Sequence, residues 1–180
     1  MVLTDTDVRD RISASEDRGA THQIQIHPFS EDSLTPVGYD LRVGGKYASM
    51  RRGGPFEIQT GDSLEIVPGD TALITTLETI GMPRDRSLSA FIFAKVSKVS
   101  MGLSHISTTV DADWVGPLLI AVTNHSMNTV ALDHGEPFCT IVFVENISPS
   151  TKACGKLAGR LDVLLERLAS GGRSTSARRR

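Results

Sequence analysis

The chain has 180 residues, enough for one domain with a substantial core, and 39% of them are hydrophobic and 22% charged. A net charge of −2 argues against a generally basic nucleic-acid-binding protein, and no apolar run approaches the roughly 18 residues that span a membrane. The last ten residues hold four arginines and no acid, so residues 1–170 carry a net charge of −6. Cys139 and Cys154 form neither a disulfide framework nor a C-x-x-C motif, and the N-terminus lacks an apolar signal core. We therefore expect a soluble, cytoplasmic protein with reduced thiols.

The N-terminus is predicted to begin with a short helix over residues 4–13. Thr4 or Asp5 can cap it, and Val8 and Ile12 fall on one face at i, i+4 spacing.

Residues 23 to 147 read as short extended runs separated by turn residues, with no helix-length periodicity between them. The predicted strands are Gln23–Phe29, Tyr39–Val43, Phe56–Gln59, Ser63–Ile66, Thr71–Leu77, Leu88–Phe93, Leu118–Thr123, Thr129–Leu132 and Pro137–Val144. Gly, Pro and Asp occupy the connections. A parallel sheet needs helical crossovers, which are missing here, so the pattern predicts a mainly β protein: an antiparallel sandwich, jelly roll or barrel.

The C-terminal part has a different character. Leucines recur at helical spacing and predict an amphipathic helix within residues 151–169; they are Leu157, Leu161, Leu164, Leu165 and Leu168. This stripe packs either on the chain's own core or an oligomer partner, or else docks another protein through Leu157–Leu168. Residues 170–180 are rich in Gly, Ser and Arg and are expected to form a basic flexible tail, a second candidate contact for a protein partner. Residues 1–150 would then form the β domain.

Two segments could carry chemistry. Asp111 and Asp113 flank Ala112, and a carboxylate in a partly closed site can orient and deprotonate a water; the alternative is a solvated turn. The second segment offers basic and hydroxyl groups suited to phosphate oxygens, or else forms an exposed strand; its residues are Lys95, Ser97, Lys98 and Ser100. The five histidines lack ligand spacing, so no protein metal ligands are predicted.

The order of motifs resembles the trimeric dUTPase and dCTP deaminase superfamily. The runs VLTDTDVRDRI, IHPFSEDSLTPVGYDLRVG and VPGDTALITTLETIGMP are similar to the deaminase branch. The resemblance implies a dUTPase-like distorted jelly roll or barrel, with the N-terminal helix before it and the amphipathic helix after it. It also implies homotrimers whose sites are shared between neighbouring subunits.

The deaminase active-site motif G-R-S-S-L-A-R-L-G-L is altered in this chain. Lys95 stands at the first arginine, Val96 at the first serine and Ser100 at the second arginine. Alignment on Asn124 places Ala121 at the position of the deaminase glutamate. The resemblance therefore implies that the residues for ordinary dCTP deamination are absent.

The dUTPase motif G-V-I-D-x-D-Y-x-G is better matched, by residues 109–116. In this resemblance Asp111 is the water-activating carboxylate, and Trp114 replaces the aromatic residue that packs on the deoxyribose. Thr140 stands where a glutamine contacts phosphate. The dUTPase Arg-Ser-Gly phosphate motif, however, reads Lys95-Val96-Ser97.

Taken together, these motifs predict a hydrolase that converts a dUTP-like pyrimidine deoxynucleoside triphosphate to its monophosphate and pyrophosphate, with Mg²⁺ implied alongside the nucleotide. A catalytically inactive nucleotide-binding or assembly module is one alternative. A divergent dCTP deaminase is another. No membrane and no specific nucleic acid is expected as a partner.

Overall fold

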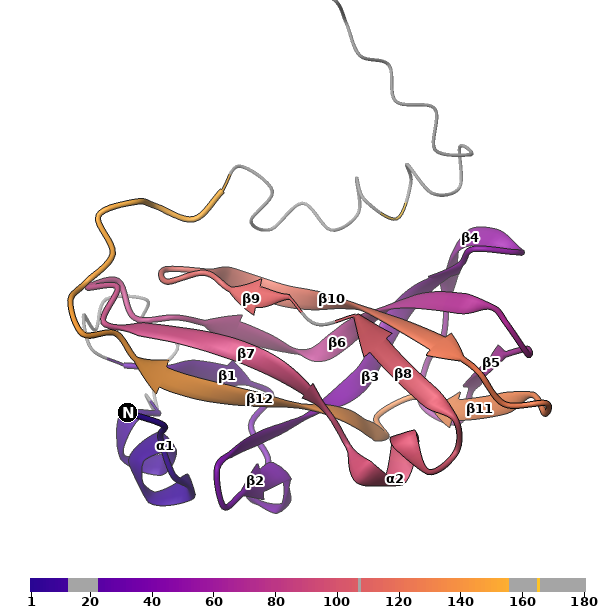
Figure 1. Cartoon of the computed structure of the whole chain (residues 1–180), viewed down its shortest axis with the longest axis horizontal. Coiled ribbons are helices and arrows are strands. Elements are labelled where there is room, and N and C mark those ends of the chain that lie inside the picture. The colour runs from indigo at the N-terminus through magenta and orange to yellow at the C-terminus, as the bar shows by residue number, and fades with distance from the viewer. Residues whose placement is uncertain (13–22, 107, 156–164, 166–180) are drawn as a thin grey trace, which may run out of the picture.

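The computed structural model describes residues 1–12, 23–106, 108–155 and 165 of the chain (Figure 1). Strands dominate, and all their pairings are antiparallel, as the sequence predicted. In chain order the elements are α1 (Asp5–Arg11), β1 (Gln25–His27), the 3-10 helix η1 (Glu31–Ser33), β2 (Leu34–Thr35), β3 (Gly38–Ser49), β4 (Gly53–Glu57), β5 (Ser63–Ile66), β6 (Thr71–Gly81), β7 (Leu88–Ala94), α2 (Val96–Val99), β8 (Leu103–Ile106), β9 (Thr109–Val110), β10 (Val115–Asn124), β11 (Val130–Asp133) and β12 (Pro137–Glu145).

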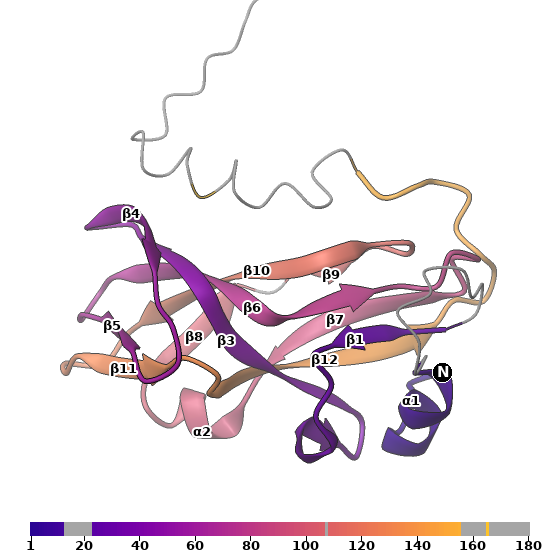
Figure 2. The same cartoon turned by 180° about the vertical axis from the view of Figure 1, so that it is seen from behind.

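The main sheet follows the path β8-β10-β6-β3-β12-β7-β9, with β1, β2 and β4 paired at its sides. Its two end strands, β8 and β9, are neighbours in sequence, since only residues 107 and 108 separate them. The Cα atoms of Ile106 and Thr109 are three residues apart in the chain and therefore at most about 11 Å apart in space. The sheet must curl until its two ends nearly meet. Figures 1 and 2 show this curled, half-barrel shape. A distorted barrel-like jelly roll is thus present.

The inside of the curl is the hydrophobic core. In β10 alternate residues are buried, which is the pattern of a strand with one face inward. The largest side chains that are fully buried are Tyr39, Phe143, Ile24, Leu41, Leu64, Ile66, Ile74, Ile80, Leu88, Ile92, Ile120 and Leu132. They come from strands of the main sheet, from β5 and β11, which pair as a separate two-stranded sheet, and from Ile24 just before β1, so one continuous core joins these parts.

The predicted N-terminal helix is confirmed, although it is shorter than expected. Thr4 and Asp7 form a reciprocal capping box, and Val8 is buried against the core. The helix ends at Arg11, and Ile12 forms a bridge with Ile24.

Most of the predicted C-terminal helix and the whole Arg-rich tail lie outside the described residues. Leu165 is described, and it is helical and 1% exposed. The leucine stripe and its packing stay predictions. No helix in the described part of the chain is long and apolar enough to cross a membrane.

Candidate functional site

Lys95, one of the predicted phosphate contacts, lies at the end of β7, where three strands converge. Its ammonium forms an ion pair with the carboxylate of Asp40 on β3. The other oxygen of that carboxylate accepts a 2.6 Å hydrogen bond from the hydroxyl of Thr140 on β12. The register explains the meeting, because Thr140 pairs with Asp40 on one side and with Phe93 on the other. The structure therefore brings Lys95 and Thr140 together through Asp40.

Lys98 occupies a different environment from Lys95. Its side chain is 9% exposed, and its ammonium forms an ion pair with Glu136 in the turn before β12. The second carboxylate oxygen of Glu136 accepts the backbone N–H of Asp133, 3.0 Å away. This pairing fixes Lys98 inside the fold, so its charge is compensated by the protein itself.

The alternative of an exposed strand over Lys95–Ser100 is wrong. Residues Val96–Val99 form the short helix α2, whose N-cap is Lys95. The backbone N–H groups of Val99 and Ser100 donate to the carbonyls of Lys95 and Val96, 3.0 and 2.9 Å away. These local bonds replace a strand ladder, and they leave Ser97 and Ser100 exposed.

Asp111, the predicted water-activating carboxylate, begins a tight turn between β9 and β10. The N–H of Trp114 donates to the Asp111 carbonyl at 3.1 Å. Asp113, the third residue of the turn, has a φ of +71°, a conformation that favours glycine and that aspartate tolerates better than most residues. The Asp111 side chain is exposed, as a group that meets substrate or water must be.

Trp114 is half-buried and packs against the hydrophobic core. Its indole N–H donates a 3.0 Å hydrogen bond to the carbonyl of Gly116. The backbone carbonyl of Trp114 accepts the N–H of Met82 at 2.7 Å. Trp114 therefore anchors one side of the Asp111 turn, and its contact with a deoxyribose stays a prediction.

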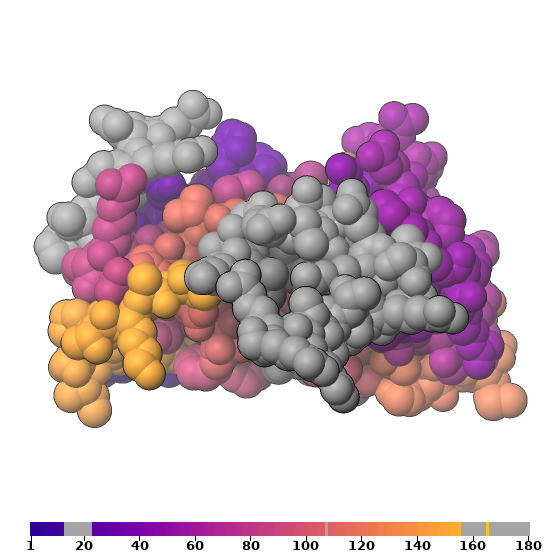
Figure 3. Space-filling model, turned by 90° about the horizontal axis from the view of Figure 1, so that it is seen from above, coloured from indigo at the N-terminus to yellow at the C-terminus, as the bar shows by residue number. Residues whose placement is uncertain are grey.

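The segment that follows β12 lies against this turn. The backbone N–H of Cys154 donates to Oδ1 of Asp113 at 2.8 Å, and the Cys154 thiol lies 3.6 Å from Oδ2 of Asp111. Burial, and then the neighbouring Asp111 carboxylate, raise the pKa of the Cys154 thiol, which favours the protonated form that donates this hydrogen bond. Figure 3 shows this segment, coloured orange, on the surface of the molecule.

The two predicted parts of the site do not meet within one chain. In the β7–β9 pairing Ala90 lies opposite Val110, so Asp111 follows at the start of β7, whereas Lys95 follows its end. Five residues of strand between Ala90 and Lys95 correspond to roughly 17 Å. Figure 1 shows α2 and the β9–β10 turn at opposite ends of β7. A single site containing both Asp111 and Lys95 therefore requires residues from two copies of the chain.

Large apolar side chains are exposed on β7, α2 and β8, next to Lys95. Exposed apolar side chains on connected elements are typical of surfaces that contact another protein, a membrane or a ligand. The side chains exposed here are Phe91, Phe93, Val96, Val99, Met101 and Ile106, with exposed fractions from 39% to 85%. This apolar surface is available to bring a second copy close to the lysine.

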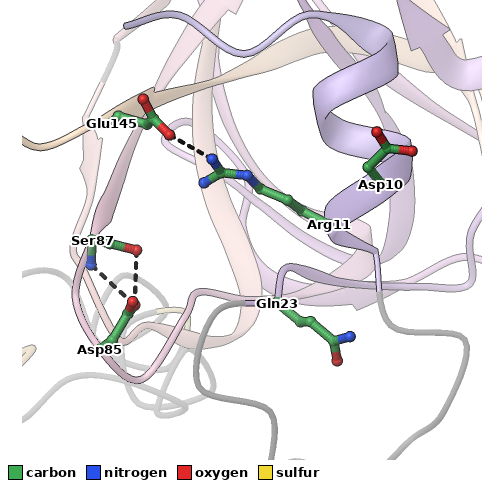
Figure 4. A pocket seen from close by; sticks show the side chains of 6 residues that line it. All are labelled: Asp10, Arg11, Gln23, Asp85, Ser87 and Glu145. Atoms are coloured by element: carbon green, nitrogen blue, oxygen red, sulfur yellow. Dashed lines mark hydrogen bonds and ion pairs between the residues drawn. The ribbon is translucent and has the colours of Figure 1, made fainter.

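A cavity of about 440 Å³ lies elsewhere, between α1, the loop after β6 and the end of β12. Figure 4 shows Arg11 pointing across it toward Glu145, with which it forms an ion pair. Ser87 donates to Asp85 at 2.8 Å on another wall. None of the predicted site residues lines this cavity, so it is separate from both parts of the candidate site.

Sequence reasoning missed four residues that contact the candidate site residues. They are Asp40, Glu136, Cys154 and Arg86, whose guanidinium donates to Asp113 in the Asp111 turn at 2.8 Å. For Asp40 a signal existed, because an acid in the apolar run Tyr39–Val43 has to find a buried partner. The others depend on pairings between distant segments.

Ala121, which the resemblance places at the deaminase glutamate, is half-buried on β10 and pairs with Leu73 and Ile106. Within the described ranges, no group of three or more His, Cys, Asp or Glu residues is arranged to hold a metal ion. Both oxygens of Asp40 already have partners.

Comparison with known proteins identifies the class. The family model for dCTP deaminase-like proteins matches residues 2–146. Similar proteins include the dCTP deaminase of Thermococcus kodakarensis, 37% identical over 71% of this chain and 80% of its own length. Another is a probable deoxyuridine 5′-triphosphate nucleotidohydrolase of Sulfolobus islandicus rod-shaped virus 1, 30% identical over 84% of this chain and 89% of its own length.

A solved structure agrees at the level of the fold. The 2′-deoxycytidine 5′-triphosphate deaminase from Agrobacterium tumefaciens superimposes with a TM-score of 0.64 at 16% identity, over 81% of this chain and 48% of its own. Fold, motif order and relatives define a protein of the dUTPase and dCTP deaminase superfamily. Within that superfamily, the chain belongs to the dCTP deaminase-like family.

Proposed function

We propose that this protein is a nucleoside triphosphate pyrophosphohydrolase that acts on dUTP or a related pyrimidine deoxynucleotide. The proposal rests on the residues at two positions, Asp111 in the hydrolase motif and Ala121 at the deaminase glutamate. An exposed aspartate, Asp111, stands in the hydrolase motif, while the deaminase glutamate is replaced by Ala121. A methyl group cannot shuttle the proton that deamination needs, whereas a carboxylate can accept one from water.

In the proposed reaction, Asp111 orients a water and takes its proton as the water oxygen attacks the α-phosphorus. The bond from that phosphorus to the bridging oxygen breaks, and pyrophosphate leaves. Lys95 contributes positive charge to the phosphates, since its ammonium has three donors and Asp40 uses only part of them. The exposed hydroxyl of Ser97 is a proposed neutral contact. Thr140 and Ser100 are proposed as further contacts, and each has to release the hydrogen bond that it now donates, to Asp40 and to the Ser97 carbonyl respectively, before it can donate to a phosphate.

Mg²⁺ belongs to this proposal as part of the nucleotide complex. Mg²⁺ is commonly bound through substrate phosphates with one or two carboxylates and several waters. Because Asp40 has both oxygens engaged, the described residues supply no preformed cage for the ion. Bound to the triphosphate, the ion would neutralise part of its charge.

The proposal includes a homotrimer in which Asp111 of one subunit faces Lys95 of its neighbour. The separation of these residues within one chain and the apolar surface beside Lys95 both support it. A heterologous contact of this kind closes into a ring and repeats the same site around it.

The test uses the purified full chain with Mg²⁺ and a panel of dUTP, dCTP, dTTP and dATP, with pyrophosphate and ammonia measured in parallel. We expect pyrophosphate from a pyrimidine nucleotide and its loss in Asp111→Asn, by at least about a hundredfold. Asp32→Asn, at another exposed aspartate, is the matched control and should keep full activity. Ammonia from dCTP would establish the divergent deaminase instead.

A non-catalytic nucleotide-binding module is the second candidate. It is favoured by the finding that both Lys95 and Lys98 are already neutralised by carboxylates of the same chain. Thermal stabilisation by dUTP or dCTP without any turnover would establish this candidate.

A further inference from the structure

Two residues that strain the backbone are bonded to each other beside Asp111. Among the residues that the structure describes, Arg86 and Asp113 are the two non-glycine residues with clearly positive φ, at +58° and +71°. The guanidinium Nε of Arg86 donates to Oδ2 of Asp113 at 2.8 Å. Strained backbone persists only where the surroundings hold it, and it concentrates at functional sites.

Arg86 is itself held firmly by three parts of the chain. Its own N–H donates to the carbonyl of Pro83 at 3.1 Å. Its carbonyl accepts the side-chain amide of Asn146 at 3.0 Å and the N–H of Ser150 at 3.3 Å. Its Nη1 donates to the carbonyl of Thr151 at 3.2 Å. These hydrogen bonds fix the backbone and guanidinium of Arg86 where the side chain contacts Asp113.

The Asp111 side chain has much less support of its own. It is exposed, and the contact that the structure gives its carboxylate is the thiol of Cys154 at 3.6 Å. The direction in which it points depends on the turn from Asp111 to Trp114. In that turn Asp113 has to keep its positive φ. The side chains of Arg86 and Asp113 are 28% and 19% exposed, so their ion pair is partly shielded from water.

We propose that Arg86 is a positioning residue for hydrolysis, which acts by clamping Asp113 and thereby aiming the Asp111 carboxylate. The inference rests on the proposed function, and it adds to it a residue outside every motif of the resemblance. Arg86 touches no substrate in this role. A misplacement of the reacting group by about 1 Å can lower a rate by about a hundredfold, so a loosened turn acts mainly on kcat.

The first arm of the test is kinetic. Arg86→Gln is expected to lower kcat at least about tenfold while KM changes less than about threefold. Arg84→Gln removes an exposed arginine two residues away and should behave as wild type. Adding Asp113→Gly to Arg86→Gln should restore most of kcat, because glycine adopts positive φ without help. A raised KM that glycine does not rescue would mean that Arg86 binds the nucleotide directly, which overturns the proposal.

The second arm needs no turnover. Trp114 is the single tryptophan of the chain and belongs to the turn itself. Its emission should shift to the red and become easier to quench with acrylamide in Arg86→Gln, and not in Arg84→Gln. A wild-type spectrum for Arg86→Gln would contradict the clamp. Arg86→Lys, which keeps the charge but not the planar fork, should give an intermediate result and serves if the glutamine variant does not fold.

The two arms separate the two proposals. A wild-type protein that releases no pyrophosphate overturns the proposed function, and the catalytic role of Arg86 falls with it, whereas the fluorescence shows whether the clamp exists. Normal turnover in wild type, loss in Asp111→Asn and full activity in Arg86→Gln would overturn the positioning role alone.

Discussion

The hydroxyl of Thr140 and the carboxylate of Asp40 are joined by a 2.6 Å hydrogen bond across the β3–β12 pair. Asp40 is 8% exposed, and its other oxygen holds Lys95. The Asp40 carboxylate therefore stabilises the fold by joining Thr140 and Lys95, in addition to any effect on a ligand.

Replacement of Asp40 should cost stability. Asp40→Asn leaves the Lys95 ammonium without its counter-charge in a site that is largely shielded, and we expect a loss of about 2 kcal/mol in the free energy of unfolding. Thr140→Val should lose about 1–2 kcal/mol through the missing bond to a charged acceptor. Urea unfolding measures both. Glu57→Gln, in an exposed pair with Lys46, is the control and should lose under about 1 kcal/mol. Equal losses in all three variants would contradict the assignment.

The two lysines should separate into a ligand contact and a structural group. Lys95→Met is expected to raise KM for the nucleotide, because its side chain is 23% exposed next to the exposed hydroxyls of α2. Lys98→Met should leave KM within about twofold of wild type, because its ammonium is buried against Glu136. Each variant strands a carboxylate, Asp40 or Glu136, so both should lower the free energy of unfolding, and the KM change is what separates them. Steady-state kinetics and urea unfolding on the same samples distinguish these effects. A larger KM change for Lys98→Met would reverse the assignment.

The Cys154 thiol should react slowly with iodoacetamide. Its pKa is raised by burial and then by Asp111, so at pH 8 less of it is the reactive thiolate than in a free cysteine. Because the folded-state pKa is raised, the contact stabilises the fold while the thiol is protonated and is lost as pH rises through that pKa. Asp111→Asn should lower the pKa and speed alkylation, while Asp133→Asn should not. Cys139, at 1% exposure, should stay unlabelled in the folded protein.

Two impaired variants should complement each other if the site is shared, when activity is measured at a nucleotide concentration well below the raised KM of Lys95→Met. Asp111→Asn and Lys95→Met are expected to regain activity when they are unfolded together and refolded as mixed trimers. Random mixing would restore roughly a quarter of the sites, those that combine an intact Asp111 with an intact Lys95 from the neighbour. Pyrophosphate release measures the recovery, and separately refolded variants mixed afterwards are the control. No recovery would mean that Asp111 and Lys95 do not belong to the same site.

The sequence anticipated the strands better than the site. Strands such as Ser63–Ile66 were predicted correctly because polar and apolar residues alternate along them. In the structure Leu64 and Ile66 are buried, while Ser63 and Glu65 are exposed. The helix α2 was missed because four residues give no helical period, and its two valines suit a strand equally well.

The site was harder to predict because it depends on register. Asp40 and Lys95 are 55 residues apart in sequence, and no local pattern shows that they meet. Likewise, the distance between Asp111 and Lys95 follows only from the pairing of Ala90 with Val110. The resemblance had implied a site shared between neighbouring subunits, and the roles of Asp111 and Lys95 in it stay predictions.

The position of β12 constrains how the protein is made. Among the strands that the structure describes it is the last to leave the ribosome, yet it lies in the middle of the sheet, between β3 and β7. Until residues 137–145 are available, those two strands have no common partner and each exposes a row of unpaired backbone groups. Tyr39 must then find Ile141 over about 100 residues of chain, which makes folding slow compared with local hairpins. A chain stopped short of β12 is therefore expected to aggregate rather than fold in part.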